Sequence, residues 1–161
     1  MLTLKTLLPG NPMNALFAFL HHLAAFLLVS TLVVEMALLK GPLDPARARQ
    51  LQRTDLLYGI AAGLAVALGF LRVYYFEKGS EYYFHNLYFM LKLGLFAGIG
   101  ALSVYPTVVF LKWGKSLKQG VMPVIPEDQL RNLRKVLMAE LAGVVGMLCC
   151  AALMARGYGM L

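Results

Sequence analysis

The sequence predicts an all-α integral membrane protein whose four spanning helices run up and down as one bundle. Hydrophobic residues make up 60% of the 161 residues, and the mean hydropathy is +0.68. Charged residues make up 14%, against about 25% in a typical soluble domain. A soluble chain of this length could not bury so much apolar surface, whereas helices in a bilayer turn it toward lipid.

Four apolar segments each reach the roughly 20 residues needed to cross the hydrocarbon core of a bilayer. Thr54 and Asp55 directly precede the second segment, which suggests a helix N-cap there. Pro106 should kink or end the third helix. The first 13 residues lack a cleavage pattern, so the first span should be retained. Residues 1–161 are therefore predicted to form a single four-span domain, with spans at about 14–39, 56–76, 86–113 and 136–158.

Basic residues gather in two loops, 40–55 and 112–135, which lie on the same side of a four-span protein. The positive-inside bias places these loops in the cytoplasm and both termini in the periplasm of a bacterial inner membrane. This topology also accounts for the net charge of +7. In a soluble protein such a charge would suggest nucleic acid as a partner, so here we expect the lipid bilayer instead.

Five ionisable residues lie at or near membrane depth: His21, His22, Arg72, His85 and Lys92. Each buried charge costs roughly 2.5–3.5 kcal/mol on insertion scales, so such residues indicate a functional site by default. At 1.5 Å per residue, all five belong to the periplasmic half of the predicted bundle.

Helical periodicity separates the two adjacent histidines. His21 shares a face with Asn14 and with small residues, which favours the bundle interior, whereas His22 points sideways. His85 and Lys92 are seven residues apart and share a face if the third helix starts early enough.

Two glutamates belong to the cytoplasmic half. Glu35 and Glu140 are expected to pair with Lys40 or Lys135 near the membrane surface. Aromatic residues between 74 and 89 should form an interfacial belt, with the option of covering a flat ligand.

Two histidines from different helices of a four-helix bundle can supply the axial ligands of b-type haem. Periodicity favours His21 over His22 as the first ligand, and His85 is the favoured second ligand, with Lys92 in reserve. Arg72 and Lys78, with Lys92 below them, suit the two haem propionates. The sequence thus predicts a membrane haem protein that performs electron transfer or haem-linked oxidoreduction near the periplasmic face.

Other functions use the same residues. His21, His22 and His85 are also candidate ligands of a metal ion, and Lys92 and Arg72 with the histidines are a candidate relay of a proton or anion carrier. In a purely structural alternative, the histidines hydrogen-bond across helices and Arg72 snorkels to headgroups. Small-residue stripes suit a homodimer, or a redox partner protein, as well as a cofactor. No hydrolase, phosphate-loop or dinucleotide motif occurs.

Several motifs together resemble a family of predicted four-helix bacterial inner-membrane proteins of unknown function. They cover nearly the whole chain and are His21-His22, Asp55–Gly59, Leu71–Gly79, Tyr82-Tyr83, Asn86, Lys92, Tyr105–Thr107 and Met154–Gly157. The resemblance implies the four-span fold and brings no established activity.

The chain is more loosely similar to two other families, the small haem-binding protoporphyrinogen oxidase of bacteria and the copper-resistance D membrane domain. The oxidase family likewise has a histidine in its first helix and an arginine–lysine pair further on, and His21 or His22, Arg72 and Lys92 occupy comparable places. This similarity implies haem, and it makes protoporphyrinogen oxidation the alternative enzymatic function. The chain departs from that pattern by its doubled histidine and by the lack of a tryptophan in the first span.

Overall fold

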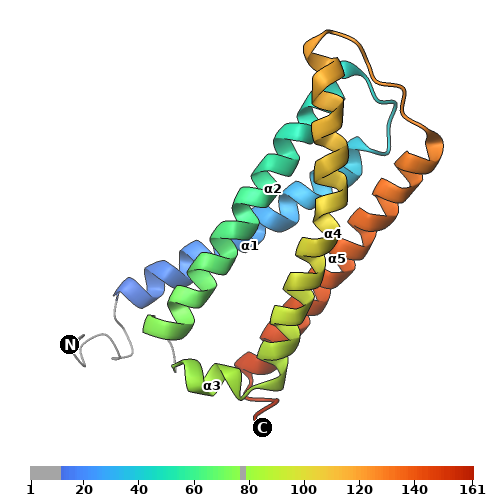
Figure 1. The fold of residues 1–161 in the computed structure, drawn as a ribbon. Helices are drawn as coiled ribbons and strands as arrows, with labels where there is room; N and C mark the ends of the chain where they lie inside the picture. The colour runs from blue at the N-terminus through green and yellow to red at the C-terminus, as the bar shows by residue number, and fades with distance from the viewer. Residues whose placement is uncertain (1–11, 77–78) are drawn as a thin grey trace.

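Lipid offers no hydrogen bonds to the backbone, so an apolar chain that crosses it must form helices. The computed structural model describes residues 12–76 and 79–161. It contains four helices that are long and apolar enough to cross a membrane (Figure 1). Within the described residues no strand occurs, and the predicted all-α fold is confirmed. The four long helices are α1 (Pro12–Leu38), α2 (Pro45–Leu71), α4 (Leu87–Lys118) and α5 (Glu127–Ala155).

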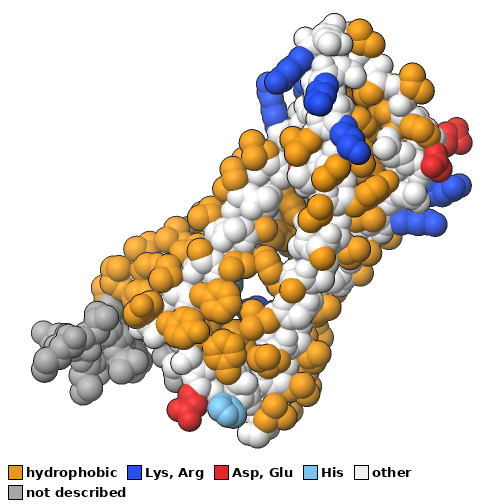
Figure 2. All heavy atoms as spheres, viewed as in Figure 1, with side chains coloured by type: hydrophobic (Ala, Val, Ile, Leu, Met, Phe, Trp, Pro, Cys, Tyr) orange, Lys and Arg blue, Asp and Glu red, His pale blue; other side chains and the backbone are white. Residues whose placement is uncertain are grey.

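The helices alternate in direction. The α1–α2 and α4–α5 loops lie at one end of the bundle, and the start of α1 lies with the C-terminus at the other (Figure 1). Lys and Arg side chains gather on the loop end in Figure 2. We call this the basic end and the opposite one the terminal end. At the terminal end, a π-helical turn (Arg72–Phe76) and a short helix α3 (Ser80–Phe84) connect α2 to α4.

Helix α2 begins well before its predicted span. Asp44 is the N-cap, its carboxylate accepts a hydrogen bond from the Arg47 N–H at 2.7 Å, and Pro45 occupies the first helical turn. Aspartate at the cap and proline just inside it are the residues that favour a helix start. The predicted cap at Thr54-Asp55 is therefore wrong, since both residues are buried inside the helix.

Helix α4 runs through Pro106 to Lys118 and bends along its length rather than ending (Figure 1). Gln52 of α2 donates a hydrogen bond from Nε2 to the Phe110 carbonyl of α4 at 2.5 Å. Gly114 makes room for this amide, because a Cβ there would lie 2.8 Å from Nε2 of Gln52. Helix α5 ends at Ala155, just before a glycine-rich segment in which Gly157 has a φ of 82°.

The core is concentrated in the basic half. The helices pair as two hairpins, α1 with α2 and α4 with α5. Glycine brings the second pair close, since a Cβ on Gly143 would lie 2.8 Å from Cδ1 of Ile99. Fully buried apolar side chains fill the space between the hairpins at this end, namely Leu32, Leu39, Leu51, Phe110, Leu133 and Leu137.

Toward the terminal end the two hairpins lean apart (Figure 1). No described residue of α5 beyond Val144 is buried, nor is any residue of α2 beyond Ala61. Figure 2 shows a hollow between α2 and α4 with an apolar rim, and basic side-chain atoms are visible inside it. The bundle is thus closed in its basic half and open in its terminal half.

Asn86 ties the chain's end to the start of α4. Its side chain is fully buried, and Oδ1 caps α4 by accepting from the N–H groups of Tyr88 at 3.0 Å and Phe89 at 3.3 Å. Its Nδ2 donates to the Tyr158 carbonyl at 2.9 Å, and the Leu87 N–H donates to the Gly159 carbonyl at 2.7 Å. In the sequence Asn86 stands out only as part of a motif, and in the structure it joins the start of α4 to the C-terminal segment.

We expect Gly143→Ala to destabilise the protein by about 1–3 kcal/mol, because the new methyl group forces Ile99 out of its position between α4 and α5. Gly98→Ala is the matched control, since no atom lies within 4 Å of a Cβ at Gly98. Thermal unfolding in detergent should show a lower midpoint for the first variant alone. Equal midpoints would contradict close packing at Gly143.

Asn86→Ala should cost about 2 kcal/mol, because it removes a helix cap and leaves the Tyr158 carbonyl without a donor. Asn86→Asp keeps the cap acceptor but not the donor, and we expect an intermediate loss. Asn132→Ala, at an exposed position of α5, is the control for the same denaturant-unfolding measurement. If Asn132→Ala lost as much unfolding free energy as Asn86→Ala, the stabilising role of the Asn86 hydrogen bonds would be refuted.

Candidate functional site

His21 turns one edge of its ring toward α2. The ring rests on Gly69, where a Cβ would lie 3.3 Å from Cε1. Its Nδ1 is buried and has no hydrogen-bond partner at normal distance, although the Ala65 carbonyl lies beside it. The prediction that His21 faces the bundle interior is therefore confirmed, and the small residue at position 69 allows the close approach.

Two cations converge on this histidine. Arg72 comes from the π-helical turn after α2, and Lys92 comes from the second turn of α4. Both lie close enough to His21 to interact with it electrostatically, and they also act on one another. Both side chains are half-buried. We call these three residues the His21 group.

A fourth helix reaches the same place through Cys150 of α5, which interacts electrostatically with Lys92. The sequence offered no signal for this contact, because a single half-buried cysteine on an apolar helix is usually a packing residue. With Cys150 included, all four spans contribute to the surroundings of the His21 group.

Of the other two histidines, His22 meets the His21 ring edge-on, with ring centroids 6.2 Å apart, whereas His85 lies apart. His22 is exposed on the outer surface of α1, and its Nδ1 is bonded to the Ala18 carbonyl at 2.7 Å. His85 ends α3, where its Nδ1 is bonded to the Glu81 carbonyl at 2.8 Å and its own carbonyl accepts from the Leu161 N–H at 3.0 Å. Helix α4 begins only at Leu87, so His85 does not share a helical face with Lys92.

In the part of the chain that the structure describes, no three His, Cys, Asp or Glu side chains gather closely enough to hold a metal ion. The predicted propionate partner Lys78 lies outside the described residues, as does the segment before Pro12. The structure thus unites His21, Arg72 and Lys92, with the exposed His22 ring edge-on to His21, and it leaves His85 separate from them.

The His21 group suits a ligand that carries negative charge for the two cations and a metal ion or a hydrogen-bonding atom for the imidazole. Two cations at membrane depth attract negative charge strongly, because little water screens them. An imidazole whose Nδ1 faces a backbone carbonyl has the orientation of a metal-ligating histidine, with Nε2 left for the metal. The hollow in Figure 2 gives access from the side of the bundle.

A second polar group lies in the basic half. Glu35 of α1 and Glu140 of α5 are each 1% exposed, and Asp55 of α2 accepts a hydrogen bond from the Thr107 hydroxyl of α4 at 2.9 Å. Neither carboxylate oxygen of Glu140 has a hydrogen-bond partner among the described residues. The predicted pairing with Lys40 or Lys135 is wrong, because both glutamates face the interior of the bundle.

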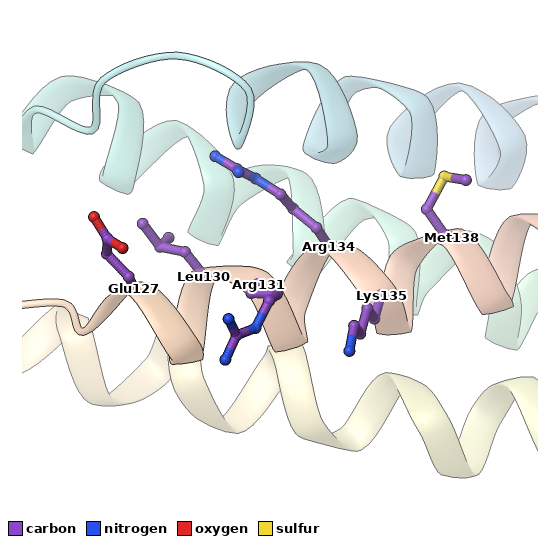
Figure 3. A pocket seen from close by; sticks show the side chains of 6 residues that line it. All are labelled: Glu127, Leu130, Arg131, Arg134, Lys135 and Met138. Carbon is purple, nitrogen blue, oxygen red and sulfur yellow. The ribbon is translucent and has the colours of Figure 1, made fainter.

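A basic groove follows the outer face of α5 at the basic end (Figure 3). Arg134 points across it and caps the end of α1, donating from Nε at 3.0 Å and from Nη2 at 2.6 Å to the Leu39 carbonyl. Arg131 and Lys135 project away from Arg134. This cap is a favourable use of arginine at a helix C-terminus, so the groove has a structural explanation.

Residues 13–159 match the model of a family described as a predicted membrane protein (DUF2214). No curated protein and no solved structure matches the chain. The looser similarity to the oxidase and copper-resistance families therefore remains a prediction.

Proposed function

We propose that this chain, which belongs to the DUF2214 family of predicted membrane proteins, binds b-type haem in the open terminal half of its bundle. The observation that carries the proposal is the His21 group, in which an imidazole and two cations meet beside a hollow between α2 and α4. Haem presents an iron that takes imidazole and two propionates that take cations.

The residues present fit this group. The Nδ1 edge of His21 faces α2, which leaves Nε2 as the coordinating atom. Arg72 and Lys92 approach from two different elements, so each can pair with one propionate. Gly69 lets the His21 ring lie against α2, and Gly63 on the same helix has no atom within 4 Å of where a Cβ would stand.

Of the two candidates for a second axial ligand, Lys92 lies in the His21 group, whereas the contacts of His85 are with Glu81 and Leu161. We therefore assign His21 as the histidine ligand and Lys92 to a propionate, and we assign no second ligand.

The bound haem would supply one-electron chemistry, and the chain's residues would bind it and tune it. If haem is bound, the apolar side chains around it would keep water from the ring, and Arg72 and Lys92 would favour the ionised propionates. We propose electron transfer or haem-linked oxidoreduction as the activity.

An absorption spectrum of the protein, purified in detergent after expression with ample haem, tests this proposal. We expect a Soret band and sharp α and β bands on dithionite reduction. His21→Ala should lose most of the bound haem, because it removes the axial imidazole. Lys92→Met should bind haem more weakly, because one propionate loses its cation.

His22→Ala is the matched control, since His22 is the same residue type on the next position but faces outward. It should keep the full spectrum, as should His85→Ala. A featureless spectrum of the wild-type protein, or equal losses in His21→Ala and His22→Ala, would exclude this haem site.

We also propose that the basic end faces the cytoplasm of a bacterial inner membrane, following the positive-inside bias. The opening near the His21 group then belongs to the periplasmic half. Both basic loops lie at one end of the bundle, which supports a single orientation.

Reporter fusions test this orientation in cells. Alkaline phosphatase fused after Leu161 should be active, and the green fluorescent protein at the same position should stay dark. Phosphatase inserted after Gly120, in the α4–α5 loop, is the control and should be inactive. The reverse pattern would overturn the proposed topology.

A further inference from the structure

Four polar side chains from three helices meet inside the basic half of the bundle. They are Glu35 of α1, Asp55 and Tyr58 of α2, and Glu140 of α5, which we call the acidic core. Their exposed fractions are 1%, 8%, 5% and 1% in that order. Helix α4 adds the Thr107 hydroxyl, which donates to Asp55 at 2.9 Å.

Apolar side chains separate the acidic core from the basic end. On every spanning helix, a buried apolar residue lies about one turn closer to that end than the polar one. These residues are Leu39 on α1, Leu51 on α2, Phe110 on α4 and Leu137 on α5, each at most 1% exposed. The lysines and arginines of the basic loops are therefore kept away from the carboxyl groups.

No cation balances the acidic core within the described chain. The charged and titratable groups that act on Glu35, Asp55, Tyr58 and Glu140 belong to these four residues themselves. Helix α4 contributes Thr107 to this region, which does not titrate. Three buried negative charges without a counter-ion would be very costly in surroundings of low dielectric constant.

The hydrogen bonds of the acidic core are also incomplete. Both oxygens of Glu140 and Oε1 of Glu35 are buried without a partner. The Tyr58 hydroxyl is the one side-chain hydrogen-bonding neighbour of Glu140 among the described residues, and it lies beyond the normal hydrogen-bond distance from the carboxylate. Ionised carboxylates only accept hydrogen bonds, so they cannot satisfy one another unless one of them carries a proton.

We infer that the acidic core is a proton-binding site, in which Glu35, Asp55 and Glu140 share at least one proton taken from water. The bound proton turns one carboxylate into a hydrogen-bond donor and removes one negative charge. It therefore compensates both for the missing donors and for the missing counter-ion. A metal ion is not the ligand we assign, because no three such side chains of the described residues have the geometry to hold one. This inference does not depend on haem.

Infrared spectroscopy of the haem-free protein in lipid nanodiscs tests the assignment. A protonated carboxyl group has a C=O stretching band that a carboxylate lacks, and the band shifts in heavy water. At neutral pH we expect this band in the wild-type protein and a loss of most of its intensity in Glu140→Gln. Glu127→Gln, at an exposed glutamate on the same helix, should leave the band unchanged.

Tyr58→Phe provides a second test that keeps every carboxyl group, and it should shift the frequency of the band without removing it. A wild-type spectrum with no protonated carboxyl band would overturn the inference. So would metal analysis that finds a stoichiometric ion in the wild-type protein and none in Glu140→Gln. His21→Ala should retain the band, so failure of the haem proposal and failure of this one are distinguishable.

Discussion

The high cost of an unpaired polar group in an apolar medium organises this protein. Backbone groups meet that cost within long helices. Side chains meet it either at the ends, where Arg134 bonds to the Leu39 carbonyl, or inside the bundle, where Thr107 bonds to Asp55. Among the described residues, the side-chain polar atoms that remain buried without a partner belong to Asn14, His21, Glu35 and Glu140. The three titratable residues among these are the positions at which a ligand or a proton would be most strongly held.

Packing divides the bundle into two halves with different properties. Glycine contacts such as Gly143 with Ile99 hold α4 and α5 together, and large apolar side chains close the basic half. The hydrogen bonds of Asn86 to the C-terminal segment and to the first turn of α4 fix the other end of the α4–α5 hairpin. Because the two hairpins separate toward the terminal end, a ligand can approach the His21 group while the acidic core stays enclosed.

The two polar groups also differ in charge. The His21 group joins an imidazole to two cations, and the acidic core joins three carboxyl groups to a phenol. Opposite signs in the two halves of one bundle suit a protein that holds an anionic cofactor on one side and protons on the other.

The sequence by itself determined the four spans, the gathering of basic residues at one end and the inward face of His21, because hydropathy and helical periodicity are local properties. Only the tertiary structure decided which polar residues meet. Asp55 proved to be interior rather than a cap, since Asp44 and Pro45 start α2 earlier. Glu35 met Glu140 and not lysine, Cys150 joined Lys92, and His85 stayed apart. Each of these contacts depends on where a helix begins and on the register of that helix against its neighbours, and no local sequence pattern encodes that register.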